Sequence, residues 1–224
     1  MDAPCLTNRL CLTSAELLEA FRLRYASYGE KGFIAPNEEG LFYDRYDALP
    51  NCLTFAVYNR EEMVGSIRAC TYSSEHGWFD IPAKYGYPSA FATWMRERNI
   101  VIEWNRFVIH PRCSDLAATI EFALLGAVPF FASYFDSPSF MAGVRENHVK
   151  FYQRFGYERI SGLERYPNTN FKATLMAMDW ANHAKRIREH RAFSRCFEFQ
   201  PSVTNIDTGS RRLFDARFRE PCPA

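Results

Sequence analysis

Ile100-Val101-Ile102-Glu103-Trp104-Asn105-Arg106-Phe107-Val108-Ile109 is a predicted β-strand in which apolar residues dominate, although one acid and one base interrupt it. Taking a charged side chain out of water is costly unless it is paired and hydrogen-bonded. A strand that keeps Glu103 and Arg106 beside a strongly apolar core is therefore more typical of a functional site than of a purely structural strand. We expect the functional site at this strand.

Glu103 and Arg106 are three positions apart, which in a regular strand places their side chains on opposite faces of the sheet. Both side chains face one pocket only if a β-bulge shifts the alternation between them. The alternative is that Glu103 forms a salt bridge that only orders the sheet.

The residues around this strand predict a sheet with helices. Residues 53–58 and 63–72 are rich in β-forming residues and flank a polar turn, which indicates an antiparallel hairpin. After the central strand, Ser114 is the predicted N-cap of a helix that Pro129 should kink or end. A short strand is predicted near residues 140–144.

The N-terminal part of the chain predicts one long helix followed by a long loop. Thr13 and Glu16 have capping-box spacing, and apolar residues then recur at helical intervals until Gly29. Residues 31–50 are irregular and predict a loop, and a short helix is expected near residues 91–96.

The C-terminal part predicts a compact helix over residues 147–155, ending at Gly156, and then strands at 157–161 and 172–179. Residues 181–195 predict a basic helix. Helices and strands in this order are typical of an α+β protein in which helices cover a central sheet.

Composition narrows the class of protein. The 224 residues are 47% hydrophobic, with a net charge of +1, which favours a globular domain with a substantial core. The 7 cysteines are scattered and the 5 histidines lack metal-ligand spacing, so neither a disulfide scaffold nor a metal site is predicted.

No signal peptide and no apolar run of about 18 residues is apparent in the sequence. We therefore expect a soluble, reduced, cytoplasmic protein that does not insert into a membrane. The basic residues are not interleaved with an aromatic stacking platform, so nucleic-acid binding is not expected.

A heptapeptide, Phe151-Tyr152-Gln153-Arg154-Phe155-Gly156-Tyr157, resembles the late F-Y-x-x-x-G-F/Y signature of GNAT-type acyltransferases. Four further motifs occur in the order found in acyl-homoserine lactone (autoinducer) synthases and long-chain N-acyl amino acid synthases. They are Phe21-Arg22-Leu23-Arg24-Tyr25, Asp44-Arg45-Tyr46-Asp47, Gly65-Ser66-Ile67-Arg68 and Glu103-Trp104-Asn105-Arg106-Phe107. The resemblance spans roughly residues 16 to 180.

The resemblance implies an α+β, GNAT-like fold with a mixed, mostly antiparallel central sheet flanked by helices. It also implies a bulge on the central strand, where backbone donors freed from pairing meet a thioester carbonyl. We expect residues 1–180 to form the acyltransferase domain and residues 181–224 a basic C-terminal helix and tail.

Amide formation from a thioester needs a base for the amine proton and donors for the developing oxyanion. Glu103 is the candidate base, because its apolar flanks should raise its pKa toward a useful range. The resemblance also implies a role for Tyr152 in reprotonating the leaving thiolate. Core packing is the alternative role of Tyr152.

The remaining candidates are expected to hold the amine substrate. Asp44 and Asp47 would hold an ammonium group, with a turn-forming role as the alternative for Asp47. Arg68 would clamp a carboxylate or pair with these acids. Arg106 would bind a carboxylate or orient Glu103, with ion pairing to the Asp44–Asp47 loop as the alternative, and Arg24 is a further candidate for substrate binding.

The donor is expected to be an acyl-phosphopantetheine carried on acyl carrier protein, with no permanently bound cofactor. Acetyl-CoA users have a glycine-rich phosphate loop after the central strand, whereas residues 111–117 contain no glycine. The related synthases share this lack and take acyl chains from acyl carrier protein, an acidic partner. The basic residues expected to meet it are Arg186, Arg188, Arg191 and Arg195.

The acceptor is expected to be the α-amino group of an amino acid. Autoinducer synthases usually carry a Trp soon after the first helix and Pro-Thr after the arginine of the second strand. This chain has Phe33 and Ala69-Cys70-Thr71 at those places. Two alternatives stay open: acyl-homoserine lactone synthesis from S-adenosylmethionine, and a non-catalytic acyl-binding or regulatory protein.

Overall fold

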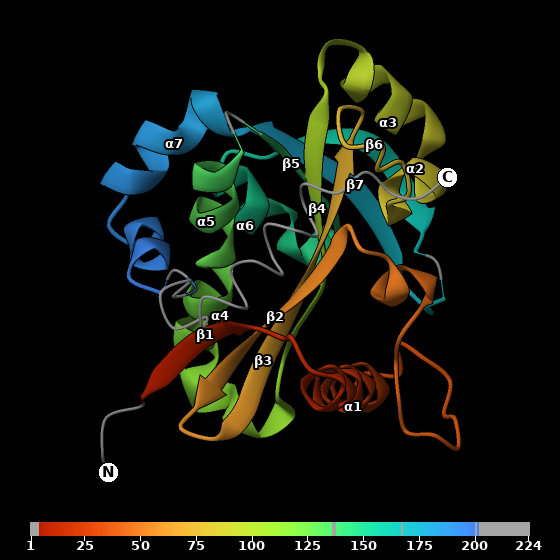
Figure 1. Ribbon diagram of the computed structural model, residues 1–224, viewed down its shortest axis with the longest axis vertical. Coiled ribbons are helices and arrows are strands. Elements are labelled where there is room, and N and C mark those ends of the chain that lie inside the picture. The colour runs from red at the N-terminus through yellow and green to blue at the C-terminus, as the bar shows by residue number, and fades with distance from the viewer. Residues whose placement is uncertain (1–4, 136–137, 167, 200, 202–224) are drawn as a thin grey trace.

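The computed structural model describes residues 5–135, 138–166, 168–199 and 201. Within them, seven strands form one sheet in the order β1-β2-β3-β4-β5-β7-β6 (Figure 1). The strands are β1 (Leu6–Leu10), β2 (Cys52–Asn59), β3 (Glu62–Ser73), β4 (Ile100–Ile109), β5 (Ser139–Val144), β6 (Glu158–Arg165) and β7 (Lys172–Asp179). Every neighbouring pair is antiparallel except β4 and β5, which run parallel. The expected α+β, mostly antiparallel mixed sheet is confirmed.

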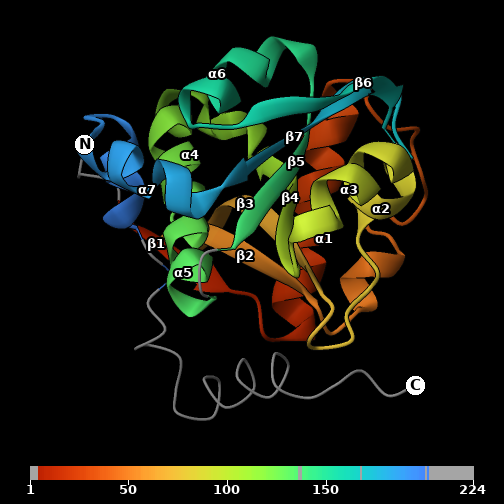
Figure 2. The same ribbon diagram turned by 90° about the horizontal axis from the view of Figure 1, so that it is seen from above.

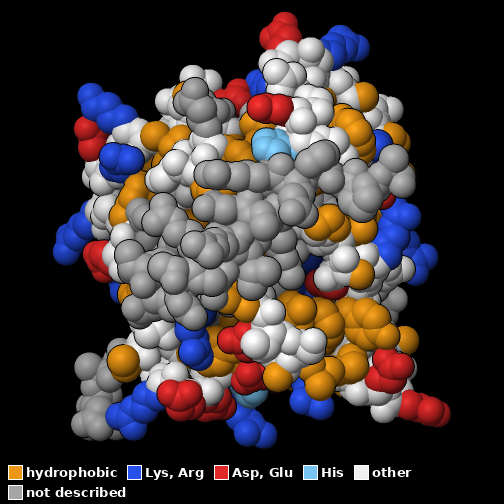
Figure 3. Space-filling view, viewed as in Figure 1, with side chains coloured by type: hydrophobic (Ala, Val, Ile, Leu, Met, Phe, Trp, Pro, Cys, Tyr) orange, Lys and Arg blue, Asp and Glu red, His pale blue; other side chains and the backbone are white. Residues whose placement is uncertain are grey.

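Helices cover both faces of the sheet, as Figure 2 shows. One face is packed by α4 (Ala117–Leu125), α5 (Ala127–Tyr134), α6 (Val149–Arg154) and α7 (Trp180–Glu189), which enclose the largest apolar core. The other is covered by α1 (Ser14–Glu30), α2 (Pro82–Gly86) and α3 (Pro88–Trp94) over two smaller apolar clusters. Charged side chains of both signs are scattered over the face seen in Figure 3, in keeping with the small net charge.

The first helix begins as the sequence predicts. The Thr13 side chain accepts a hydrogen bond from the Glu16 backbone amide, and the Glu16 carboxylate accepts one from the Thr13 amide. Gly29 does not end the helix, which continues to Glu30. The chain turns just afterwards at Gly32, whose φ of +64° suits glycine.

Two predictions about the segment after β4 are wrong in detail. Ser114 is not the N-cap, because a 3-10 turn over Pro111–Leu116 precedes α4 and Leu116 takes the capping position. Pro129 does not make the break, which falls earlier, at Gly126 between α4 and α5. Pro129 lies in the first turn of α5, where a residue without an amide proton loses no helical hydrogen bond.

One segment, Pro111–Tyr134, is long and apolar enough to cross a membrane by length and composition alone. Half of its most apolar stretch is buried, and Ile120, Leu124 and Phe131 are fully buried against the sheet. The two α-helices of this segment, α4 and α5, therefore belong to the core of the fold.

Two elements were not predicted. The strand β1 pairs with the edge of β2, but its five residues include polar Asn8 and Arg9 and lack a strand pattern. The helix α2 has five residues and starts at Pro82. Both are too short for periodicity to reveal them.

The central strand carries the expected irregularity. Ser66 of β3 pairs with Val108, but Arg68, two residues on, pairs with Asn105, so β4 has one extra residue. Arg106, inside this interval, has a φ of +53°, a left-handed conformation that is uncommon for non-glycine residues. The β-bulge is confirmed, and it allows Arg106 to share the face of the sheet used by Asn105 and Glu103.

Gly156, the glycine of the heptapeptide, ends α6 with a φ of +104°. A Cβ atom added there would lie 2.7 Å from Cγ of His183 on α7. We expect Gly156→Ala to lower the free energy of unfolding by about 1–3 kcal/mol, measured by urea denaturation. Both the backbone strain of a positive φ at alanine and the overlap of its Cβ atom with His183 destabilise the folded state. Gly29→Ala is the control, since no atom lies within 4 Å and the position is helical. Equal stability of the two variants would contradict this account.

Candidate active site

Three arginines and two aspartates form one buried network against the sheet. Arg68 Nη1 lies 2.7 Å from Asp44 Oδ1 and 2.7 Å from Asp47 Oδ2. Arg24 Nη1 is 2.8 Å from Asp47 Oδ1, and Arg106 Nη2 is 2.6 Å from Asp44 Oδ2. The predicted residues from α1, the loop before β2, β3 and β4 are thus brought together.

Local structure holds this network in place. Asp44 and Asp47 form a capping box around the 3-10 turn Arg45–Ala48, so each carboxylate also accepts a backbone amide. Asn105 Oδ1 accepts a hydrogen bond from Arg68 Nε at 2.7 Å. Asp47 therefore makes the turn-forming contact that was the alternative to substrate binding, and it also pairs with Arg24 and Arg68.

The network has one excess positive charge, because three guanidinium groups face two carboxylates. The Arg106 side chain is only 3% exposed, and its Nε and Nη1 atoms are buried without a hydrogen-bond partner. Buried donors are normally satisfied, so these atoms indicate a place for an oxygen ligand. Stacking of the guanidinium on Phe42, 4.3 Å from the ring centroid, fixes its orientation.

Electrostatics keep the two aspartates ionised. Burial alone raises the pKa of Asp44, but the hydrogen bonds and charges of Arg68 and Arg106 outweigh it and hold the pKa well below its ordinary value. Burial also raises the pKa of Asp47, but the charges of Arg24 and Arg68 outweigh this effect and lower the pKa below its ordinary value.

Glu103 has the opposite environment. It is 1% exposed, and its Oε2 atom accepts a hydrogen bond of 2.6 Å from the backbone amide of Ala83 on α2. Burial raises the pKa of Glu103 to about 7, although the Ala83 bond and the charge of Arg68 act against the shift. A carboxyl with this pKa exchanges protons near neutral pH, as a general base must.

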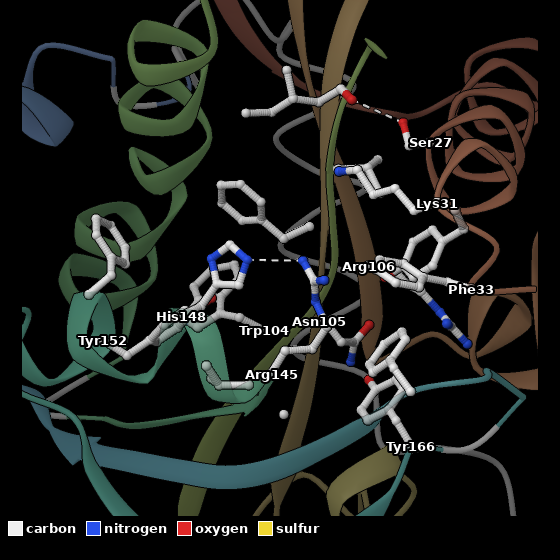
Figure 4. Close-up of a pocket in the computed structure, with 18 of the residues that line it drawn as sticks. Ser27, Lys31, Phe33, Trp104, Asn105, Arg106, Arg145, His148, Tyr152 and Tyr166 are labelled. Carbon is white, nitrogen blue, oxygen red and sulfur yellow. Dashed lines mark hydrogen bonds between the residues drawn. The ribbon is translucent and has the colours of Figure 1, made fainter. Parts of the chain in front are cut away.

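A cavity of about 280 Å³ opens where β4 and β5 separate. The parallel pairing ends at Trp104 and Ala142, whereas β4 continues to Ile109 and β5 to Val144. Residues 104–109 and 143–145 line the two sides of the resulting gap (Figure 4). Backbone that is unpaired between β4 and β5 thus faces a cavity whose walls combine aromatic, aliphatic and charged side chains.

The cavity includes some predicted residues and leaves out others. Arg106 and Tyr152 line it, whereas Glu103, Arg24 and Arg68 do not. The lining residue Asn105 connects to the buried network through Arg68, and it follows Glu103 by two positions on β4. The interpretation that Glu103 and Arg106 face one shared cavity is therefore wrong. Arg106 lines the cavity, whereas Glu103 lies behind its wall.

Sequence reasoning missed Tyr166, which lies just beyond β6 and lines the cavity (Figure 4). Burial raises the pKa of its phenol well above its ordinary value, and the charges of Arg106 and Glu103 both act on it. Its ring covers Gly143, where an added Cβ atom would lie 2.6 Å from the ring. No motif surrounds this tyrosine, so the sequence carries no signal for it.

Of the C-terminal arginines expected to meet a carrier protein, three contact other parts of the chain and one is exposed to solvent. Arg186 donates to the carbonyl oxygens of Gln153 and Arg154 at the end of α6. Arg188 stacks over Phe197 and Arg195 over Phe122, while Arg191 is exposed. The tail from residue 202 lies outside the described residues.

A mixed sheet with a bulged fourth strand, a cavity where that strand parts from the fifth, and a buried acid on the bulged strand together define a GNAT-like N-acyltransferase. The sequence pattern of one family, described as N-acyl amino acid synthase FeeM, matches residues 19–179. The chain belongs to this family, which confirms the expected group of enzymes. Comparison with curated proteins gave no match.

Solved structures share the fold. FeeM, an N-acyl amino acid synthase from uncultured soil microbes, is 22% identical with a TM-score of 0.66, over 81% of this chain and 96% of FeeM. The acyl-homoserine lactone synthase LasI is 15% identical with a TM-score of 0.59, over 79% and 91% of the two chains. An acyl-CoA N-acyltransferase from Pseudomonas aeruginosa is 14% identical with a TM-score of 0.51, over 78% and 99%.

Proposed function

We propose that this N-acyltransferase moves a fatty acyl group from the phosphopantetheine arm of acyl carrier protein to the α-amino group of an amino acid, in the cytoplasm. The observation that carries the proposal is the pairing of a buried acid of pKa about 7 with a bulged strand whose arginine has unpartnered donors at a cavity. No cofactor stays bound between turnovers, since the thioester itself supplies the activated acyl group.

The reaction forms an amide C–N bond and breaks the thioester C–S bond. The amine nitrogen attacks the thioester carbon in the cavity, and the proton it loses passes to Glu103. Because Glu103 lies behind the cavity wall, a water carries this proton. Unpaired backbone amides near the bulge of β4 donate to the oxyanion.

The leaving thiolate takes a proton from Tyr152, which lines the cavity. Burial raises the pKa of this phenol above its ordinary value, so it carries its proton at neutral pH. The proton held by Glu103 then returns to the phenolate through solvent, which restores the starting state.

The acceptor is oriented by its carboxylate. In the proposed complex this group accepts a charge-assisted hydrogen bond from one of the unpartnered nitrogens of Arg106, Nε or Nη1, which compensates the excess positive charge of the network. Asp44 and Asp47 act through the arginines rather than on the ammonium group, because their oxygens are already bonded to Arg24, Arg68 and Arg106.

Mass spectrometry of reaction mixtures tests the function. The protein is incubated with a long-chain acyl carrier protein thioester or the matching acyl-CoA, and with an amino-acid mixture or S-adenosylmethionine. We expect an N-acyl amino acid, formed faster from the carrier-protein donor. An acyl lactone would establish the homoserine lactone alternative, and lipid binding without any product would establish a non-catalytic protein.

The carboxylate role of Arg106 predicts a specific kinetic change. We expect Arg106→Lys to raise KM for the amino acid about tenfold or more, because a lysine keeps the charge but lacks the several nitrogens with which a guanidinium can bond Asp44 and the substrate carboxylate at once. The same variant should leave the rate with an acceptor amine that lacks a carboxylate nearly unchanged. A similar loss with both acceptors would contradict carboxylate binding.

A further inference from the structure

Three basic side chains, two of them cationic, lie at the rim of the cavity, apart from the buried network. Lys31 follows α1, Arg145 follows β5, and His148 belongs to the 3-10 turn Glu146–His148 before α6. All three line the cavity, and Figure 4 shows Arg145 in contact with His148 while Lys31 extends from the side of α1. Arg145 Nη2 lies 2.9 Å from His148 Nε2, so the arginine donates to a neutral imidazole.

This rim cluster of Lys31, Arg145 and His148 has no acidic partner within the part of the chain that the structure describes. The acid that lines the same cavity is Glu121 on α4, and burial raises its pKa, which favours its neutral form. Desolvation and the charges of Arg145 and Lys31 lower the pKa of His148. Like charges gathered at a cavity mouth favour an anionic ligand.

Arg145 is held in a fixed position although it is partly exposed. Its guanidinium stacks over Phe33, 4.5 Å from the ring centroid, and over Phe171, at 5.7 Å. Both rings also line the cavity. A guanidinium ordered in this way loses little entropy when it binds an oxyanion.

The turn that follows β4 does not offer an alternative anion site. The Arg112 amide donates to Nδ1 of His110, and the Cys113 amide donates to the His110 carbonyl oxygen. A 3-10 turn, rather than the start of an α-helix, occupies Pro111–Leu116. The amides that would receive a phosphate at a helix N-terminus are therefore used internally.

We propose that Lys31, Arg145 and His148 bind the phosphodiester of the thioester donor's phosphopantetheine arm. This inference rests on the proposed function for the existence of such a donor. A carrier protein must stay outside while its thioester reaches the gap between β4 and β5, so its phosphate lies near the cavity mouth. The exposed positions of Lys31 and His148 suit that place, whereas the deeply buried Arg106 suits the acceptor.

The test compares two donors that differ only in the phosphate: acyl-4′-phosphopantetheine and acyl-pantetheine with the same chain. We expect Arg145→Ala to lower kcat/KM for the phosphorylated donor roughly ten- to hundredfold, the loss of one charge-assisted contact. With acyl-pantetheine the variant should equal the wild type, and Arg145→Lys should recover part of the loss. Arg154→Ala, an exposed arginine on α6 outside the cavity lining, is the matched control.

Several outcomes would overturn the inference. If Arg145→Ala slows both donors equally, the cluster does not recognise phosphate. If its penalty vanishes only when the acceptor amine lacks a carboxylate, the cluster holds the acceptor. If the wild type uses neither donor, the proposed function fails, and calorimetric titration then decides the inference separately. Phosphopantetheine must bind the wild type more tightly than pantetheine does, and Arg145→Ala must abolish that difference.

Discussion

Replacing Glu103 by glutamine is expected to lower kcat for acyl transfer by about 10²–10⁴-fold, the usual contribution of a positioned base. The amide keeps the size of the side chain, and its oxygen can still accept the hydrogen bond from the Ala83 amide. What it loses is the ability to take a proton. The measurement is steady-state formation of the N-acyl product by wild type and variant under the same conditions.

The pH dependence gives an independent test of the same group. A base must be deprotonated to act, and the pKa of Glu103 is raised to about 7 by burial. The kcat/KM of the wild type should therefore rise with pH through about 7 and then level off. In Glu103→Gln this limb of the profile should be absent.

Stability should respond in the opposite direction to activity. The carboxyl has an ordinary pKa of 4.5 and a folded-state pKa of about 7, so between these values the native state binds more protons than the unfolded state. Stability then falls as pH rises through this window, by roughly 3 kcal/mol for this group. We expect Glu103→Gln to be more stable than wild type at pH 8 and about equal to it near pH 4.5.

Glu164→Gln, an exposed acid on β6, is the matched control for these measurements and should change neither the rate nor the pH profile. A Glu103→Gln enzyme with wild-type turnover would remove the base from the mechanism. Wild-type turnover together with a loss of stability at high pH would show that Glu103 is ionised and paired in the native state, as in the purely structural alternative.

The fold around the charged residues was predictable where the signals are local. The bulge that the resemblance implied on the central strand is present, and Arg106 within it has a positive φ. Capping chemistry located the start of α1, and the hairpin followed from β-forming residues on either side of a polar turn.

The cavity itself was beyond the reach of sequence patterns. Lys31, Arg145 and Tyr166 come from three distant segments, and only the separation of β4 from β5 brings them to one space. The placement of Glu103 behind the wall follows from its bond to Ala83, whose five-residue helix had no periodic signal. The motifs predicted residues that the fold brings close together, while tertiary packing determined which of them line the cavity.

Replacing Asp44 by asparagine is expected to lower the free energy of unfolding by about 3–5 kcal/mol at neutral pH, because a buried ion pair that loses one partner leaves the other uncompensated. Asp44 accepts two hydrogen bonds from Arg68 and one from Arg106. Without its charge, three buried guanidinium groups would face Asp47 alone. The measurement is urea denaturation of variant and wild type.

Glu146→Gln is the matched control, a carboxylate-to-amide change in the Arg159–Glu146 pair, whose side chains are 37% and 61% exposed. Exposed pairs contribute about 0–1 kcal/mol, so the stability lost by the two variants should differ severalfold.

The folded-state pKa of Asp44 is depressed, so the stability that its charge contributes is complete above the ordinary value of 3.8 and is lost as pH falls through the lower, folded-state value. The cost of Asp44→Asn should therefore shrink in acid. A cost no larger than that of Glu146→Gln at neutral pH would show that the three arginines tolerate their excess charge without Asp44, and that charge balance does not hold the network together.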